Sequence, residues 1–131
     1  MATDALIALQ SSVTKTATFN GAALILPGGT PRRGLVARVI YSAASNASGA
    51  NAVTFQIDVC YDGVPTVWNP DFVAPPINLS TTVQSGEIHI PFSISPTSVA
   101  NGTQIRLTAT FSGAGSTPTI QYSGDIEAGR P

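Results

Sequence analysis

Few residues in this chain could carry acid–base or nucleophilic chemistry. His89 is its single histidine, and it alternates with Ile88 and Ile90, so its side chain is expected on the opposite face, at a surface or interface. A serine hydrolase needs a nucleophile on a sharp turn beside an oriented base, and no Gly-Xaa-Ser-Xaa-Gly sequence is present. One histidine and one cysteine without ligand spacing do not make a zinc site. We therefore expect a protein that is not an enzyme and has no cofactor.

The carboxylates offer one alternative, a calcium site. Asp58 and Asp62 stand near a turn and could hold calcium together with backbone carbonyls. We favour the simpler interpretation, in which Asp58 is a solvated strand residue and Asp62 a turn residue, and we expect no metal. Cys60 is the single cysteine, which excludes an intrachain disulfide and is typical of a structural thiol at a strand position.

Two segments could contact a partner. The glycine-rich residues 27–34 lack a following Gly-Lys-Ser/Thr and lead into a strand, which disfavours a phosphate cradle. Arg32 and Arg33 in this segment are expected to contact an acidic partner surface or to lie in a solvated loop. Trp68 and Phe72 lie in the proline-rich residues 64–80. Exposed aromatic residues on a loop commonly anchor interfaces; the alternative is that both rings plug an open end of the domain.

Composition points to an assembly. Charged residues make up 10% of the 131 residues, well below the roughly 25% usual in soluble domains, and 28 residues are serine or threonine. Such a surface repels its own copies weakly, which favours a protein that works within an assembly. The net charge of −1 gives no reason to expect nucleic acid or a membrane as partner. No signal peptide and no apolar membrane span are recognised, so synthesis in the cytoplasm is expected.

Alternating hydrophobicity predicts an all-β domain. Residues 53–61 place Val53, Phe55, Ile57 and Val59 on one face and polar residues on the other, and an Asp-Gly turn follows. Residues 87–95 and 104–112 alternate in the same way, and residues 35–42 are apolar on nearly both faces, as in a central strand. Tight and long connections together favour Greek-key crossings. We expect an antiparallel β-sandwich of jelly-roll or Greek-key type with about eight strands.

The ends of the chain complete this scheme. Residues 13–19 and 22–26 flank Asn20-Gly21, which predicts a β-hairpin. Residues 1–12 carry a short apolar patch, Leu6, Ile7 and Leu9, which must pack either on the sandwich itself or on a neighbour. Of the two, we expect an N-terminal arm that docks on a partner. Deleting the arm should weaken that docking and leave the fold intact. The whole chain, residues 1–131, is expected to be one sandwich domain with a short C-terminal tail at 128–131.

Three motifs, in order, resemble a known family. They are Val-Thr-Xaa-Thr-Ala-Thr at residues 13–18, Gly-Leu-Val-Ala-Arg-Val at 34–39, and Asn-Ala-Val-Thr-Phe-Gln-Ile with an Asp-Gly turn within 51–63. With the preceding apolar arm, they resemble the jelly-roll cement or decoration proteins of tailed-phage heads, particularly the cement protein of short-tailed Bordetella-type phages. The resemblance covers roughly the first half of the chain; the second half matches in being β-rich.

The resemblance implies a structural protein of the virion. Such a capsid decoration protein is made in the host cytoplasm, binds the outer surface of the phage head as a homo-oligomer (dimer or trimer), and stabilises contacts between major capsid protein subunits. From the residues themselves, the candidate partner contacts are Leu6, Ile7, Leu9, Arg32, Arg33, Trp68 and Phe72. Two alternatives stay open. One is a tail or baseplate accessory protein; the other is a carbohydrate-binding jelly-roll module with Trp68, Tyr61 or Tyr41 stacked on a sugar ring.

Overall fold

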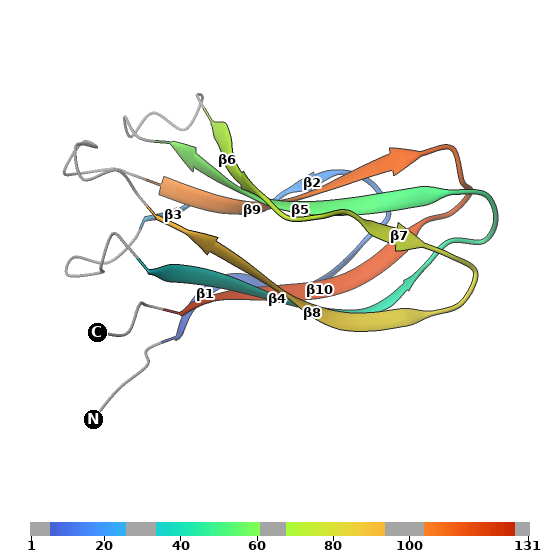
Figure 1. Cartoon of the computed structure of the whole chain (residues 1–131), viewed down its shortest axis with the longest axis horizontal. Helices are drawn as coiled ribbons and strands as arrows, with labels where there is room; N and C mark the ends of the chain where they lie inside the picture. The colour runs from blue at the N-terminus through green and yellow to red at the C-terminus, as the bar shows by residue number, and fades with distance from the viewer. Residues whose placement is uncertain (1–5, 26–33, 61–67, 94–103, 128–131) are drawn as a thin grey trace.

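Two antiparallel sheets lie face to face in the computed structural model, which describes residues 6–25, 34–60, 68–93 and 104–127 (Figure 1). These ranges contain ten strands, two of them only two residues long, and no helix. No membrane-spanning helix is therefore found within them. The predicted all-β sandwich of antiparallel strands is confirmed.

The chain passes repeatedly between the two sheets. The first sheet has the order β1 (Leu6–Lys15), β10 (Thr119–Glu127), β4 (Leu35–Ser45), β8 (Gln84–Phe92). The second has the order β2 (Phe19–Asn20), β9 (Gln104–Gly113), β5 (Asn51–Cys60), β6 (Asn69–Val73), with β3 (Leu24–Ile25) also paired to β9 and β7 (Ile77–Leu79) also paired to β5. Neighbouring strands are mostly not consecutive in sequence, which is the Greek-key pattern of a jelly roll.

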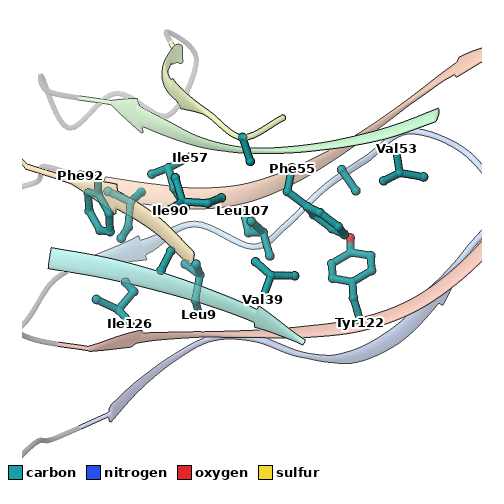
Figure 2. Packing of buried hydrophobic residues seen from close by; sticks show 14 of the residues in the cluster. Leu9, Val39, Val53, Phe55, Ile57, Ile90, Phe92, Leu107, Tyr122 and Ile126 are labelled. Atoms are coloured by element: carbon teal, nitrogen blue, oxygen red, sulfur yellow. The ribbon is translucent and has the colours of Figure 1, made fainter. Parts of the chain in front are cut away.

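The core fills the space between the sheets, as the alternating pattern predicts. Val53, Phe55, Ile57 and Val59 of β5 are fully buried. Phe55 meets Tyr122 of β10 edge to face, with ring centroids 4.9 Å apart and an interplanar angle of 68°. Figure 2 shows these two rings pointing toward each other from opposite sheets. This arrangement is a favoured one for aromatic pairs and adds to the stabilisation from apolar burial.

Central and edge strands lie where composition places them. β4, apolar on nearly both faces, is hydrogen-bonded to β10 on one side and to β8 on the other. The proline-rich residues 64–80 contribute β6 and β7, which pair with β5 at the border of the second sheet. Proline lacks the N–H that a central strand must donate, so this segment is confined to an edge.

The predicted hairpin at Asn20-Gly21 is wrong. β2 and β3, on either side of this dipeptide, both pair with β9 and not with each other. The amide of the buried Gly21 donates to the carbonyl of Leu107 on β9, 2.8 Å away. A Cβ at residue 21 would lie 2.6 Å from that carbonyl oxygen, so glycine is needed for close approach and not for a hairpin turn.

The N-terminal segment is also arranged differently from the predicted arm. Residues 6–12 belong to β1, which pairs with β10 along the border of the first sheet. Leu9 of this strand retains 6% of its exposure and packs in the core. Deleting residues 1–12 would therefore remove a core side chain and part of a strand, and the expectation that the fold survives it unchanged is corrected.

Tyr122 makes the fold sensitive to alkaline pH. Burial raises the pKa of Tyr122 to about 12. In the unfolded chain this phenol titrates near pH 10, so its contribution to stability is complete below about pH 10 and is lost as the pH rises toward 12. We expect the unfolding free energy to fall by on the order of 2 kcal/mol across this window. Urea titrations at successive pH values, followed by circular dichroism, measure it.

The variant Tyr122→Phe provides the reference for that measurement. The Tyr122 hydroxyl is buried and has no hydrogen-bond partner among the described residues. Removing the hydroxyl should change the unfolding free energy little at pH 8. It should also abolish the part of the stability loss at alkaline pH that comes from Tyr122. Parallel stability curves for the two proteins between pH 9 and about pH 12 would contradict the assignment.

Candidate functional site

The outer face of the second sheet is lined by polar side chains from β5 and β9. Because successive residues of a strand point to opposite faces, the residues between the core positions of these strands point away from the core. The register pairs Gln56 with Thr108 and Asp58 with Arg106, so these outward side chains stand side by side. We call the set Gln56, Asp58, Arg106 and Thr108 the polar cluster.

The carboxylate of Asp58 is the centre of the polar cluster. It accepts hydrogen bonds from Arg106 Nε at 2.9 Å and Thr108 Oγ1 at 2.6 Å, both on Oδ2, and from Gln56 Nε2 at 2.7 Å on Oδ1. The residue retains only 3% of its exposure. Asp58 is therefore not the solvated strand residue expected from sequence. Its burial is possible because both oxygens and the charge are matched by donors.

Trp68 contacts the polar cluster through Arg106. It immediately precedes β6, which pairs with β5, while Arg106 belongs to β9 on the far side of β5. The guanidinium carbon of Arg106 is 4.3 Å from the centroid of the Trp68 ring, a cation–π contact. Since Nε of the same guanidinium binds Asp58, the charge pair holds Arg106 in place beneath the indole. Trp68 remains partly exposed, and so do Arg106 and Gln56.

This arrangement offers groups that can recognise a ligand. A partly exposed aromatic ring offers a flat apolar surface, and the amide and hydroxyl groups beside it can donate and accept hydrogen bonds. Sites that bind small molecules combine these two properties. In the part of the chain that the structure describes, no group of three or more histidine, cysteine or acidic residues could hold a metal ion.

Among the predicted arm contacts and loop arginines, the structure describes the side chain of Leu9. Leu9 is in the core. Leu6 and Ile7 lie in β1, and their side chains are outside the described part of the structure. Arg32 and Arg33 are also outside the described residues. A role for any of these residues in partner binding stays a prediction.

The two predicted aromatic contacts point to different environments. Trp68 lies on the outer face over Arg106. Phe72 of β6 packs against the core, with its ring centroid 5.8 Å from that of Phe92. Of these two aromatic residues, Trp68 is thus the one placed over the polar cluster. Tyr41, a further candidate for stacking, belongs to β4 of the other sheet and packs partly against the core; Tyr61 is outside the described residues.

The outer face of the first sheet carries His89, Glu87, Arg38 and Asp125, whereas Cys60 belongs to the second sheet. His89 is 58% exposed and pairs with Glu87 two residues away, so it points away from the core as predicted. Arg38 of β4 lies 3.7 Å from Asp125 of β10. Exposed pairs of this kind contribute little to stability. Cys60, at the end of β5, is buried.

Sequence reasoning missed the polar cluster except for Asp58, to which it gave a different environment. A signal was present nonetheless. The chain has few charges, and Asp58 is the charged residue among the outward positions of residues 53–60. Arg106 is likewise the charged residue among the outward positions of residues 104–112. Opposite charges on neighbouring strands stabilise each other across the sheet. The unpredictable element was the pairing of β5 with β9, which brings together residues 48 positions apart.

Comparison with known proteins identifies the fold. No family model matches the chain, and no curated protein matches it. A solved structure titled "CBM4 structure and function" is similar with a TM-score of 0.51 and 14% identity over 85% of this chain. This chain spans 60% of the length of that structure. A second similar structure is a family 11 carbohydrate-binding module from Clostridium thermocellum in complex with a β-1,3-1,4-mixed-linked tetrasaccharide. The alignment covers 96% of this chain and 88% of that module, with a TM-score of 0.41 and 11% identity. At these identities the likeness concerns the fold, and the second adds no further argument.

Proposed function

We propose that this protein is a non-enzymatic carbohydrate-binding module that binds its ligand on the outer face of the second sheet. The observation that carries the proposal is Trp68, held over Arg106 beside the hydrogen-bonding groups of β5 and β9. A sugar ring has an apolar face of C–H groups and a rim of hydroxyls. An aromatic ring beside amides and hydroxyls complements both.

The polar cluster would act by holding the Trp68 ring in place. Asp58 holds Arg106 through Nε, and the Arg106 guanidinium packs on one face of the indole, so Trp68 loses little side-chain freedom when a sugar stacks on it. The partly exposed Gln56 and Thr110 lie on the same outer face and are available to sugar hydroxyls. The fold shared with a carbohydrate-binding module is consistent with this function, although fold alone does not determine function.

Affinity electrophoresis tests the proposal. The protein is run in native gels containing a soluble polysaccharide, with a polymer-free gel and a non-binding protein as references, and a glycan array extends the panel to oligosaccharides. We expect at least one polymer to retard migration in a concentration-dependent way. Failure of every polymer and every array glycan to bind would overturn the proposal.

A second candidate is the capsid decoration protein that the sequence resembles. It is favoured by the low charge of the chain, 10% of residues, which suits a surface that spends its working life in an assembly. We propose for this case a homo-oligomer on the outer surface of a phage head, bound to the major capsid protein, or an accessory of the tail. Particles isolated on a density gradient should then carry the protein in a fixed ratio to the coat protein: a ratio of order one marks a head protein, a few copies a tail protein, and absence contradicts both.

A further inference from the structure

We infer that the outer face of the second sheet binds an uncharged glycan, an inference that rests on the proposed carbohydrate-binding function. The distribution of charge over the two sheets carries it. Of the described side chains on β2, β3, β5, β6, β7 and β9, only Asp58 and Arg106 are charged. The strands of the first sheet carry the other acidic and basic side chains described on strands, which are Lys15, Arg38, Glu87, His89, Asp125 and Glu127.

The charge pair described on the second sheet, Asp58 and Arg106, neutralises itself. Arg106 Nε and Asp58 Oδ2 are 2.9 Å apart, and the two side chains retain 19% and 4% of their exposure. Both oxygens of Asp58 already accept hydrogen bonds from protein donors, and the side chain is almost completely buried, so little of it is accessible to a ligand. An acidic sugar that approached Arg106 would bring a second negative charge close to Asp58, which is unfavourable in a partly dehydrated site.

The groups that remain for a ligand are neutral donors and acceptors. In the row that runs in register across β2, β9 and β5, Thr108 is buried and donates its hydroxyl to Asp58, so the groups left for a ligand are the Asn20 amide and the Gln56 carbonyl. Thr110 and Thr54 form a second pair one step along the same strands. Amides and hydroxyls of this kind match the alternating donor and acceptor character of sugar hydroxyls without requiring a charge.

Such a site has a measurable consequence, because binding without net charge contributions is insensitive to salt. We compare the retardation of the protein in native gels that contain a neutral polymer (hydroxyethyl cellulose, galactomannan or dextran) with its retardation in gels that contain an acidic polymer (polygalacturonate or alginate). Each is measured at about 20 mM and about 500 mM sodium chloride, where the Debye length changes severalfold. The expected result is binding to a neutral polymer with an affinity that changes less than about twofold between the two salt concentrations.

A charge added to the face should change this preference. Thr110→Lys places a cation on the outer face of β9, and Gln121→Lys places the same charge on the first sheet as a matched control. We expect Thr110→Lys to gain a salt-sensitive retardation by polygalacturonate and Gln121→Lys to behave like the unaltered protein. Asp71 is a further acidic residue of the second sheet, in β6. If the ligand is uncharged, removal of this charge in Asp71→Asn should leave the affinity for neutral polymers unchanged.

The outcomes separate this inference from the proposed function. Salt-sensitive binding to the acidic polymers by the unaltered protein would overturn the uncharged ligand and leave carbohydrate binding in place. A Thr110→Lys variant indistinguishable from Gln121→Lys, or loss of neutral-polymer binding in Asp71→Asn, would also overturn it. Binding to no polymer of either class would overturn the proposed function, and this inference with it.

Discussion

Replacing Asp58 by alanine is expected to lower the unfolding free energy by about 2–4 kcal/mol. The substitution leaves Arg106 without its carboxylate and removes the acceptor of Thr108, which retains only 3% of its exposure, and of Gln56. Part of the cost is relieved by solvent, because the Arg106 side chain is 19% exposed. Urea unfolding followed by far-UV circular dichroism measures the difference.

Two further variants separate charge from volume. Asp58→Asn keeps the volume and one acceptor oxygen, so its loss should be about half that of alanine. Asp58→Leu combined with Arg106→Met removes both charges and should recover the part of the loss that comes from the unpaired Arg106. The part that comes from Thr108 should remain, because its buried hydroxyl still lacks its acceptor. If Asp58→Ala stays within about 0.5 kcal/mol of the unaltered protein, the polar cluster does not contribute to the fold as described.

Replacing Trp68 by alanine is expected to weaken glycan binding by about 30- to 700-fold, which corresponds to about 2–4 kcal/mol. The ring is the aromatic surface that the structure places over the polar cluster, and tryptophan at the centre of a contact commonly dominates its binding energy. Isothermal titration calorimetry measures the affinity without depending on the fluorescence of the removed residue.

The controls for Trp68 distinguish binding from folding. Trp68→Phe keeps an aromatic face and should retain part of the affinity. Ile40→Ala removes an apolar side chain, 43% exposed, from the outer face of the other sheet and should not change binding. Equal affinities for Trp68→Ala and Ile40→Ala, with both proteins folded, would exclude the Trp68 face as the site.

Much of the fold could be predicted because it follows from local patterns. Phe55, Ile57 and their alternating partners on β5 are buried as the period of two requires, and β8 and β9 were identified in the same way. β4 could be recognised as central since it is apolar on nearly both faces. Proline confined β6 and β7 to an edge.

Pairing between distant strands was the part that local patterns do not encode. Asn20-Gly21 has the composition of a hairpin turn, yet Gly21 is used to approach Leu107 of β9. The short apolar patch around Leu9 predicts an arm from sequence alone, whereas pairing with β10 makes this segment a strand. The candidate site depends on the same kind of information: Trp68 was singled out from sequence, and Arg106 beneath it requires three strands in register.

The most direct test of the Trp68 face is a fluorescence titration, because the chain contains a single tryptophan. The glycan that retards the protein in affinity gels is added stepwise while the emission of Trp68 is recorded. A saturating change in emission with the same dissociation constant as calorimetry is predicted, since the indole passes from partial solvent contact to contact with a sugar ring. Binding detected by calorimetry with unchanged Trp68 emission would place the glycan elsewhere and contradict the account.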